Sequence, residues 1–255
     1  ENLKKKLQPL PHLKEHFLLL QMAYCWQRSN KSLKREFLIT GDGSVTIHLP
    51  DWNEQYHSKH GAINEARYVF INTGLHHFLG ENSYKEISIM EIGFGTGLNA
   101  LLTVSEIEKL NISCKYLGVE AYPISAQEVS GLNYSEKTEI SDKLFQKLHD
   151  VPWEDNVEIT THFSLTKRKQ FFSEISEKKT IDLIYFDAFG ARVQPELWTE
   201  EIFSTMYSAL KVNGVLVTYA AKGSVRRAMQ AVGFLVERLP GPPGKREMLR
   251  ATKIT

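Results

Sequence analysis

The sequence has little of what marks secreted, membrane or metal-binding proteins. Only two cysteines occur in 255 residues, Cys25 and Cys114, and they form neither a disulfide framework nor a zinc-ligand spacing. The apolar run at residues 17–25 is shorter than the roughly 18 residues of a membrane span and lacks a signal-peptide cleavage pattern. We interpret this run as an amphipathic helix and expect a soluble, cytoplasmic protein with reduced cysteines, no metal and no membrane association.

The sequence also has almost no excess of charge. Its 31 basic and 30 acidic side chains leave a formal net charge of +1 at pH 7. Overall charge therefore neither favours nor excludes nucleic acid, and any RNA contact must come from local patches. With no internal repeat, low-complexity segment or long linker, a chain of 255 residues is expected to form one core with a modest appendage.

The N-terminal part predicts a β-hairpin followed by a helix. Two β-rich runs, residues 35–40 and 44–49, flank Gly41-Asp42-Gly43, which is a strong hairpin signal. Residues 62–72 have a helical pattern, and Gly74 is the expected C-cap of that helix.

From residue 87 onward, apolar strands alternate with helical segments, which is the pattern of a parallel sheet covered on both faces. Five parallel strands are predicted, at residues 87–92, 116–120, 157–161, 181–187 and 215–220. The final runs, 234–239 and 246–252, predict an antiparallel hairpin across the Pro- and Gly-rich residues 240–244. This order is typical of the doubly wound, Rossmann-like class I methyltransferase sheet. We expect this α/β domain over residues 81–255, with residues 1–80 (helix, β-hairpin, helix) as an extension packed on it.

A glycine-rich motif, residues 91–99, lies where the first parallel strand turns into a helix. Its glycines allow a tight turn and close approach of a ligand, and the helix N-terminus offers free amide hydrogens. The spacing lacks the third glycine of the dinucleotide fingerprint, which favours S-adenosylmethionine over NAD. A turn without any ligand is the alternative. The candidate cofactor-binding residues of the motif are Glu91, Gly93, Gly95, Thr96, Gly97 and Asn99.

Glu120 ends the second parallel strand, where a carboxylate can accept hydrogen bonds from both hydroxyls of a ribose. A solvated carboxylate at a strand end is the alternative for this residue alone. The glycine motif and Glu120 together favour nucleoside binding more than either does separately.

Asp187 and Phe189 follow the fourth parallel strand. Ligands of open α/β sheets bind beyond the carboxyl ends of the strands, so both side chains are expected to face the cofactor's methyl group. The Phe189 ring can stack on a planar base, and the Asp187 carboxylate can hold a reacting nitrogen and stabilise the charge that grows on it. We predict both residues to be catalytic, with Asp187 also contacting the cofactor; a helix-capping Asp187 is the alternative.

Several motifs together resemble one family, the methyltransferase domain of the tRNA 5-methylaminomethyl-2-thiouridine biosynthesis enzymes. The resemblance spans about residues 35–252 and rests on residues 65–70, 93–99, 187–189, 195–199, 214, 218–219, 225–227, 233–234 and 244–249. It implies N-methylation of the 5-aminomethyl group of (2-thio)uridine at tRNA wobble position 34, with S-adenosyl-L-methionine as the methyl donor. It also implies that Asp187 is the acceptor-side acid, Phe189 the base-stacking ring, and Glu120 and the glycine motif the cofactor site.

The sequence departs from this family in two respects. The best-known member continues into a flavin-dependent oxidase domain, whereas this chain ends at Thr255, so a standalone methyltransferase is expected. The family also has an acidic residue just after the third strand for the adenine amine. Here residues 162–165 read His-Phe-Ser-Leu, and Ser164 is the candidate substitute.

Further candidates concern the tRNA. Trp198 is a candidate wall of the base pocket, although a core position is equally consistent, and Arg67 and Tyr68 either approach the cofactor or pack in a helix. Four histidines, at positions 57, 60, 76 and 77, lack ligand spacing and receive no role. Basic residues in loops near the strand ends are candidate phosphate contacts, whose binding would weaken with salt; they are Lys222, Arg226, Arg227, Lys245 and Arg246.

Two other functions remain open at this level. One is transfer of a methyl or aminopropyl group to a small amine, which would also use an aspartate at a strand end. The other is a noncatalytic module that binds a nucleotide or tRNA.

Overall fold

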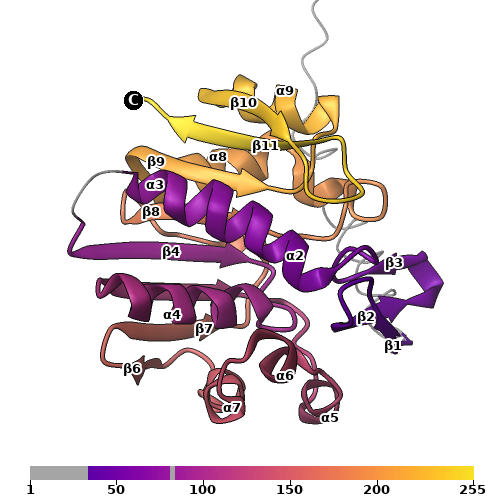
Figure 1. Ribbon diagram of the computed structural model, residues 1–255. Helices are drawn as coiled ribbons and strands as arrows, with labels where there is room; N and C mark the ends of the chain where they lie inside the picture. The colour runs from indigo at the N-terminus through magenta and orange to yellow at the C-terminus, as the bar shows by residue number, and fades with distance from the viewer. Residues whose placement is uncertain (1–33, 81–83) are drawn as a thin grey trace, which may run out of the picture.

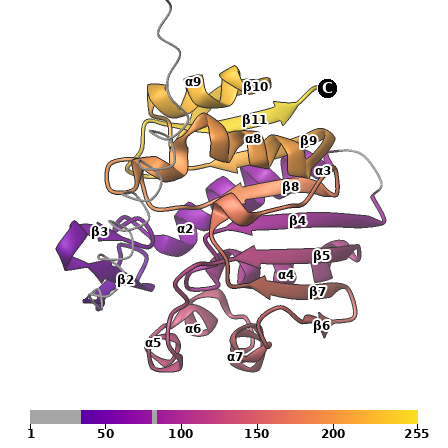
Figure 2. The ribbon, with the colours of Figure 1, turned by 180° about the vertical axis from the view of Figure 1, so that it is seen from behind.

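The structure is a computed structural model that describes residues 34–80 and 84–255. The predicted helix at 17–25, with Cys25, lies outside the described residues. In the described part, a large mixed sheet is covered by helices on both faces, and a small sheet lies beyond the carboxyl ends of its parallel strands (Figures 1 and 2). No helix among these residues combines the length and apolarity that a membrane crossing requires.

The large sheet has eight strands in the described part, in the order β10-β11-β9-β8-β4-β5-β7-β6. Strands β9, β8, β4, β5 and β7 run parallel, and β10 and β11 form an antiparallel pair at one edge. The expected doubly wound sheet with a terminal antiparallel hairpin is confirmed. The strands are β4 (Glu86–Ile92), β5 (Ser113–Val119), β6 (Asn156–Thr160), β7 (Phe163–Arg168), β8 (Ile181–Phe186), β9 (Leu210–Thr218), β10 (Phe234–Pro240) and β11 (Glu247–Lys253).

The prediction of the third parallel strand was wrong. Residues 157–161 fall on β6, which pairs antiparallel with β7 at the edge of the sheet, whereas β7 pairs parallel with β5. Alternate side chains of β7 are fully buried, but only Ile159 is buried in β6. The more apolar strand therefore takes the interior position, and the segment between β5 and β6 supplies the long crossover that a parallel pair needs.

Helices cover each face of the large sheet and are recognisable in Figure 1. One face packs against α4 (Leu98–Leu110) and the continuous helix formed by α2 (Ala62–Ala66), the π-helical stretch η2 (Arg67–His76) and α3 (His77–Leu79). The opposite face packs against α8 (Glu200–Ala209) and α9 (Gly223–Ala231), as Figure 2 shows. The remaining helices are η1 (Pro50–Trp52), α5 (Ala126–Ser130), α6 (Tyr134–Thr138), α7 (Asp142–Asp150), η3 (Phe172–Glu174) and η4 (Pro195–Trp198).

Gly74 does not end its helix, contrary to the prediction. The helix continues to Leu79 and stops at Gly80, which has a φ of 49°. A Cβ at Gly74 would lie 2.9 Å from Val217 Cγ2 and 3.2 Å from Tyr185 Cε1. Glycine is present there because the helix approaches strands β8 and β9 closely.

The predicted N-terminal hairpin is confirmed. Strands β1 (Glu36–Ile39) and β2 (Val45–Leu49) pair antiparallel, and β3 (Glu54–Gln55) adds a short third strand. Figure 1 shows this small sheet beyond the ends toward which the parallel strands point. The small sheet is therefore positioned over the carboxyl ends of the parallel strands, where ligands of such sheets bind.

Candidate active site

The glycine motif forms the predicted turn between β4 and α4. Gly93, Gly95 and Gly97 all have positive φ, of 89°, 48° and 72°. A Cβ at Gly93 would lie only 2.7 Å from the Asp187 carbonyl oxygen, so the turn and the end of β8 pack closely. Thr96 points inward and has a packing role: its hydroxyl accepts a hydrogen bond from Tyr134 at 3.2 Å.

Glu120 connects the end of β5 to this turn. Its Oε2 accepts a hydrogen bond from the Gly95 amide at 3.0 Å, and its Oε1 accepts one from the Tyr122 amide at 2.9 Å. Burial raises the pKa of this carboxyl, and the two amides oppose that rise. The carboxylate therefore lies beside the glycine turn, as predicted, and its contact with a ribose stays a prediction.

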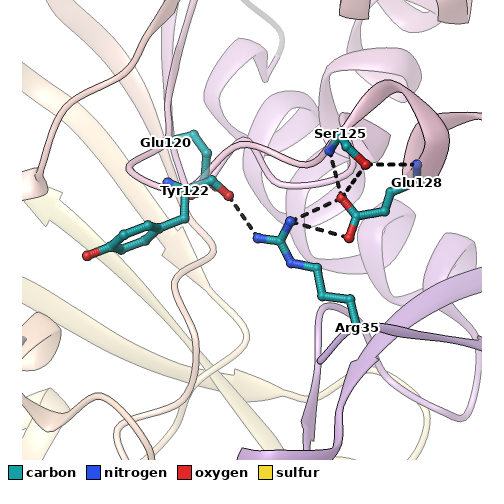
Figure 3. A network of polar contacts seen from close by, with 5 residues as sticks. All are labelled: Arg35, Glu120, Tyr122, Ser125 and Glu128. Atoms are coloured by element: carbon teal, nitrogen blue, oxygen red, sulfur yellow. Dashed lines mark hydrogen bonds and ion pairs between the residues drawn. The ribbon is translucent and has the colours of Figure 1, made fainter. Parts of the chain in front are cut away.

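Arg35 attaches the N-terminal sheet to the same region. Its guanidinium donates to the Tyr122 carbonyl at 3.0 Å and forms an ion pair with Glu128 at 3.1 Å. Glu128 also forms a capping box with Ser125 at the start of α5. Figure 3 shows Arg35 reaching this segment beside Glu120. Arg35, which directly precedes β1, thus binds the segment that follows β5.

Asn99 joins two carboxyl groups near the carboxyl ends of β4 and β8. Its Nδ2 donates to Glu91 Oε1 and to Asp187 Oδ2, both at 2.9 Å, and Tyr116 donates its hydroxyl to the other Glu91 oxygen at 2.9 Å. Burial raises the pKa of Glu91 well above its usual value and the pKa of Asp187 to about 7. Asp187 can therefore exchange a proton near neutral pH.

Phe189 lies in a group of aromatic rings that the sequence did not predict. It makes edge-to-face contacts with Trp52 and Tyr56, at centroid distances of 5.8 and 5.0 Å. Tyr56 also packs on the glycine turn, since a Cβ at Gly95 would lie 3.1 Å from its Cδ1. The two added rings come from the extension. Their only sequence signal is that aromatic residues occur in the non-periodic segment just after a hairpin.

Trp198 supports the acceptor loop from the core. Its side chain is 5% exposed and packs against Phe186 and Phe203. Its indole nitrogen donates to the Phe189 carbonyl at 2.8 Å. Of its two predicted positions, the core position is confirmed, and the residue positions the backbone of Phe189.

The five basic candidates separate into two groups. Lys222, Arg227 and Arg246 are exposed, and Arg226 is half-buried at the start of α9. Lys245 instead lies inside the site: its Nζ is 2.5 Å from a buried Glu65 carboxylate and 3.7 Å from the centre of the Tyr219 ring. Arg67 is exposed, and the Tyr68 hydroxyl donates to the Pro240 carbonyl, so neither residue makes a contact that suggests cofactor binding.

The predicted position of Ser164 at the cofactor edge is wrong. Ser164 is near the start of β7, opposite Lys115, and donates to the Cys114 carbonyl at 3.5 Å. This error follows from the misassigned strand. The residue near the carboxyl end of β7 is Lys167, whose side chain is 1% exposed and whose Nζ donates to the His149 carbonyl at 2.5 Å.

A cavity of about 120 Å³ opens beside the glycine turn, near the carboxyl ends of β5 and β7. This is several times the roughly 10–15 Å³ that a single water occupies by the same kind of measure. The cavity is thus large enough for part of a ligand. Its wall includes Phe94, Gly95, Ile124, His149, Trp153 and Lys167.

Comparison with known proteins identifies the class. Residues 136–254 match the model of a family described as S-adenosyl-L-methionine-dependent methyltransferase. Over this segment the chain is similar to S-adenosyl-L-methionine-dependent methyltransferases, and its large sheet has the doubly wound fold expected for class I members. The match favours a methyltransferase over a noncatalytic module.

The chain is similar to two curated relatives named tRNA 5-methylaminomethyl-2-thiouridine biosynthesis bifunctional protein MnmC. That of Cupriavidus metallidurans is 28% identical over 84% of this chain and 33% of the relative, and that of Leptospira interrogans is 29% identical over 83% and 34%. The chain spans about a third of the length of these relatives. Its methyltransferase fold and sequence are thus of the kind found in MnmC.

Solved structures agree with this similarity. The structure described as MnmC2 from Aquifex aeolicus has a TM-score of 0.72 and 26% identity, covering 88% of this chain and 72% of that chain. A probable spermidine synthase from Corynebacterium glutamicum has a TM-score of 0.52 and 16% identity over 87% and 77%. The second similarity concerns the fold alone.

The residues at the edge fit the predicted cofactor. Asn99 Oδ1 is buried and accepts no hydrogen bond from the residues that the structure describes, so it can accept one from the amino group of a bound ligand. The glycine turn and Glu120 provide backbone access and a ribose acceptor beside it. These groups would hold S-adenosyl-L-methionine.

Proposed function

We propose that this protein methylates the 5-aminomethyl group of (2-thio)uridine at tRNA wobble position 34, giving 5-methylaminomethyl-(2-thio)uridine. One observation carries the proposal: Asn99 of the glycine motif holds the Asp187 carboxyl, whose pKa is raised to about 7, and an aromatic ring follows two residues later. The name of the MnmC relatives supports the choice of substrate.

The proposed chemistry needs an amine that has lost its proton. When bound, S-adenosyl-L-methionine supplies a methyl group activated by its positively charged sulfur. The reaction forms a nitrogen–carbon bond, breaks a sulfur–carbon bond and releases one proton from the amine. Asp187 accepts that proton and stabilises the positive charge on the nitrogen. Asn99 holds the Asp187 carboxylate in place through its 2.9 Å hydrogen bond.

The aromatic rings of the site are proposed to bind the uracil ring. Phe189, Trp52 and Tyr56 provide flat apolar surfaces beside Asp187, and single-stranded bases commonly stack on such rings. The exposed residues Lys222, Arg227 and Arg246, together with Arg226, are the candidate tRNA-phosphate contacts. Lys245 is already paired with Glu65, so we assign it to the structure of the site.

We further propose that residues 81–255 form the catalytic domain and that residues 1–80 are an extension packed on it. The contacts of Arg35 with the segment after β5, and of Trp52 and Tyr56 with Phe189, support this division. A cytoplasmic location is proposed because tRNA is the substrate.

The test is a methyl-transfer assay with labelled S-adenosyl-L-methionine and tRNA that carries 5-aminomethyl-(2-thio)uridine. Nucleoside mass analysis should find the label in 5-methylaminomethyl-(2-thio)uridine. tRNA with an unmodified wobble uridine is the matched control and should stay unlabelled. Label in a small amine but not in tRNA would refute the proposed substrate.

A further inference from the structure

A buried lysine forms part of the wall of the cavity beside the glycine turn. Lys167 is 1% exposed, and its ammonium carries three hydrogens that can be donated. One of them goes to the His149 carbonyl at the end of α7. The Lys167 Nζ also lies 5.0 Å from the centre of the Trp153 ring. A buried ammonium with donors left over is costly unless further acceptors reach it.

The sheet register directs this lysine toward the cofactor edge. Glu91, Gly118 and Lys167 are partners across β4, β5 and β7, so their side-chain positions lie on one face. Gly118 leaves room for the Phe94 ring, which a Cβ there would approach to 2.4 Å. Lys167 is consequently separated from the acidic centre at Glu91 by an aromatic ring, and it faces the cavity from the other side.

Among the described residues of the cavity wall, Lys167 is the side chain that carries a positive charge at pH 7. Burial lowers the pKa of His149 to about 4, so that its imidazole is neutral at pH 7, and its Nε2 lies 3.2 Å from the Thr96 carbonyl. Burial lowers the pKa of Lys167 to about 8, and the neighbouring Asp150 opposes that fall. The ammonium therefore remains the main form at pH 7.

We propose that Lys167 recognises the adenine of S-adenosyl-L-methionine by donating a hydrogen bond to one of the ring nitrogens. A carboxylate in such a place accepts a hydrogen bond from the exocyclic amine, whereas an ammonium can only donate. The ring nitrogens of adenine are acceptors, so the cation selects that edge of the base. The proposal rests on the cofactor of this methyltransferase class and is independent of the tRNA substrate.

The first test measures binding of S-adenosyl-L-homocysteine by calorimetry to wild type and Lys167→Met, which keeps the apolar stem. We expect Lys167→Met to bind at least about tenfold more weakly, the effect of losing a charge-assisted hydrogen bond. The matched control is Lys147→Met. Lys147 belongs to α7 and also donates to a backbone carbonyl, that of Ile159 at 2.6 Å, but it is outside the cavity wall. Equal affinity of wild type and Lys167→Met would overturn the proposal.

The second test separates ligand recognition from a role in holding the end of α7. Analogues of S-adenosyl-L-homocysteine that lack N1, N3 or N7 of the purine are titrated into wild type. We expect one of them to bind about tenfold more weakly than the parent compound, and this difference should disappear in Lys167→Met. If wild type binds all three analogues as tightly as the parent compound, the contact is refuted, and no variant is needed for that conclusion. So would a penalty that is the same in both proteins. Binding is measured without tRNA, so failure here is distinct from failure of the proposed function.

Discussion

Two ionisable groups of opposite sign lie at the carboxyl ends of strands β8 and β7, and partial or full burial shifts the pKa of each. At the end of β8, burial raises the pKa of Asp187 to about 7, and near the end of β7, burial lowers the pKa of Lys167 to about 8. The two pKa values are thereby shifted toward 7 from opposite directions, because burial disfavours the charged form of each group. Their partners differ: an Asn side chain holds Asp187, whereas a helix-terminal carbonyl holds Lys167. Burial alone therefore does not determine the role of an ionisable group. Asp187, at the acid end of the site, is suited to accept a proton, and Lys167, at the basic end, is suited to donate a hydrogen bond.

The largest expected effect concerns the acid end. Asp187→Asn should lower the rate of methyl transfer by roughly a hundredfold or more, as does losing one preorganised electrostatic contact in other enzymes. Affinity for S-adenosyl-L-homocysteine should change little, because the amide can still accept from Asn99. Single-turnover assays and calorimetry measure the two quantities. Normal turnover in this variant would show that Asp187 has no role in methyl transfer, and the contrast with Lys167 would then be lost.

The next effect concerns the rings that the extension adds to the acid end. Trp52→Ala should raise KM for tRNA by about tenfold, because base stacking on an aromatic ring contributes about 1–3 kcal/mol. Steady-state kinetics with tRNA as the varied substrate measure this change. Phe37→Ala removes an exposed ring of the same extension that packs on Gly131, and it should leave KM unchanged. Equal effects of the two substitutions would argue against base binding by Trp52.

Between the two ends lies Glu120, which is expected to bind ribose. Glu120→Gln should weaken S-adenosyl-L-homocysteine binding by about threefold to tenfold, since one charged hydrogen-bond acceptor is lost. Isothermal titration calorimetry provides the affinity. The control is Glu128→Gln, whose carboxylate binds Arg35 and Ser125 and not the glycine turn. An unchanged affinity for Glu120→Gln would show that the ribose lies elsewhere.

The last effect is on stability rather than on binding or turnover. The pKa of Asp187 is about 7 in the folded state, above its ordinary value of 3.8, so wild type loses stability as pH rises from about 4 to 7. Asp187→Asn carries no such charge and should be more stable above pH 7 by about 1–3 kcal/mol. Urea unfolding at pH 4, 6 and 8 measures the difference. If the stability difference between Asp187→Asn and wild type does not grow with pH, burial does not destabilise the charged Asp187 carboxylate.

Local sequence was sufficient for the features whose parts are adjacent in the chain. The hairpin around Gly41-Asp42-Gly43, the glycine turn and the acidic residues at the ends of β5 and β8 were all positioned correctly, because a strand end and the residue after it are covalently joined. Their contacts with ligand stay predictions. The third strand failed because residues 156–160 and 163–168 both alternate, and pairing with β5 decides which one is interior.

What the sequence by itself determined is four of the five parallel strands, the terminal hairpin, the glycine turn and the acidic residues after β5 and β8, since periodicity and glycine positions act over a few residues. Only the tertiary structure decided that Asn99 joins Glu91 to Asp187, that Trp52 and Tyr56 contact Phe189, and that Lys167 faces the cavity. Each of these contacts depends on strand register or on the docking of the extension. Both result from burial summed over the whole core, which no short segment encodes.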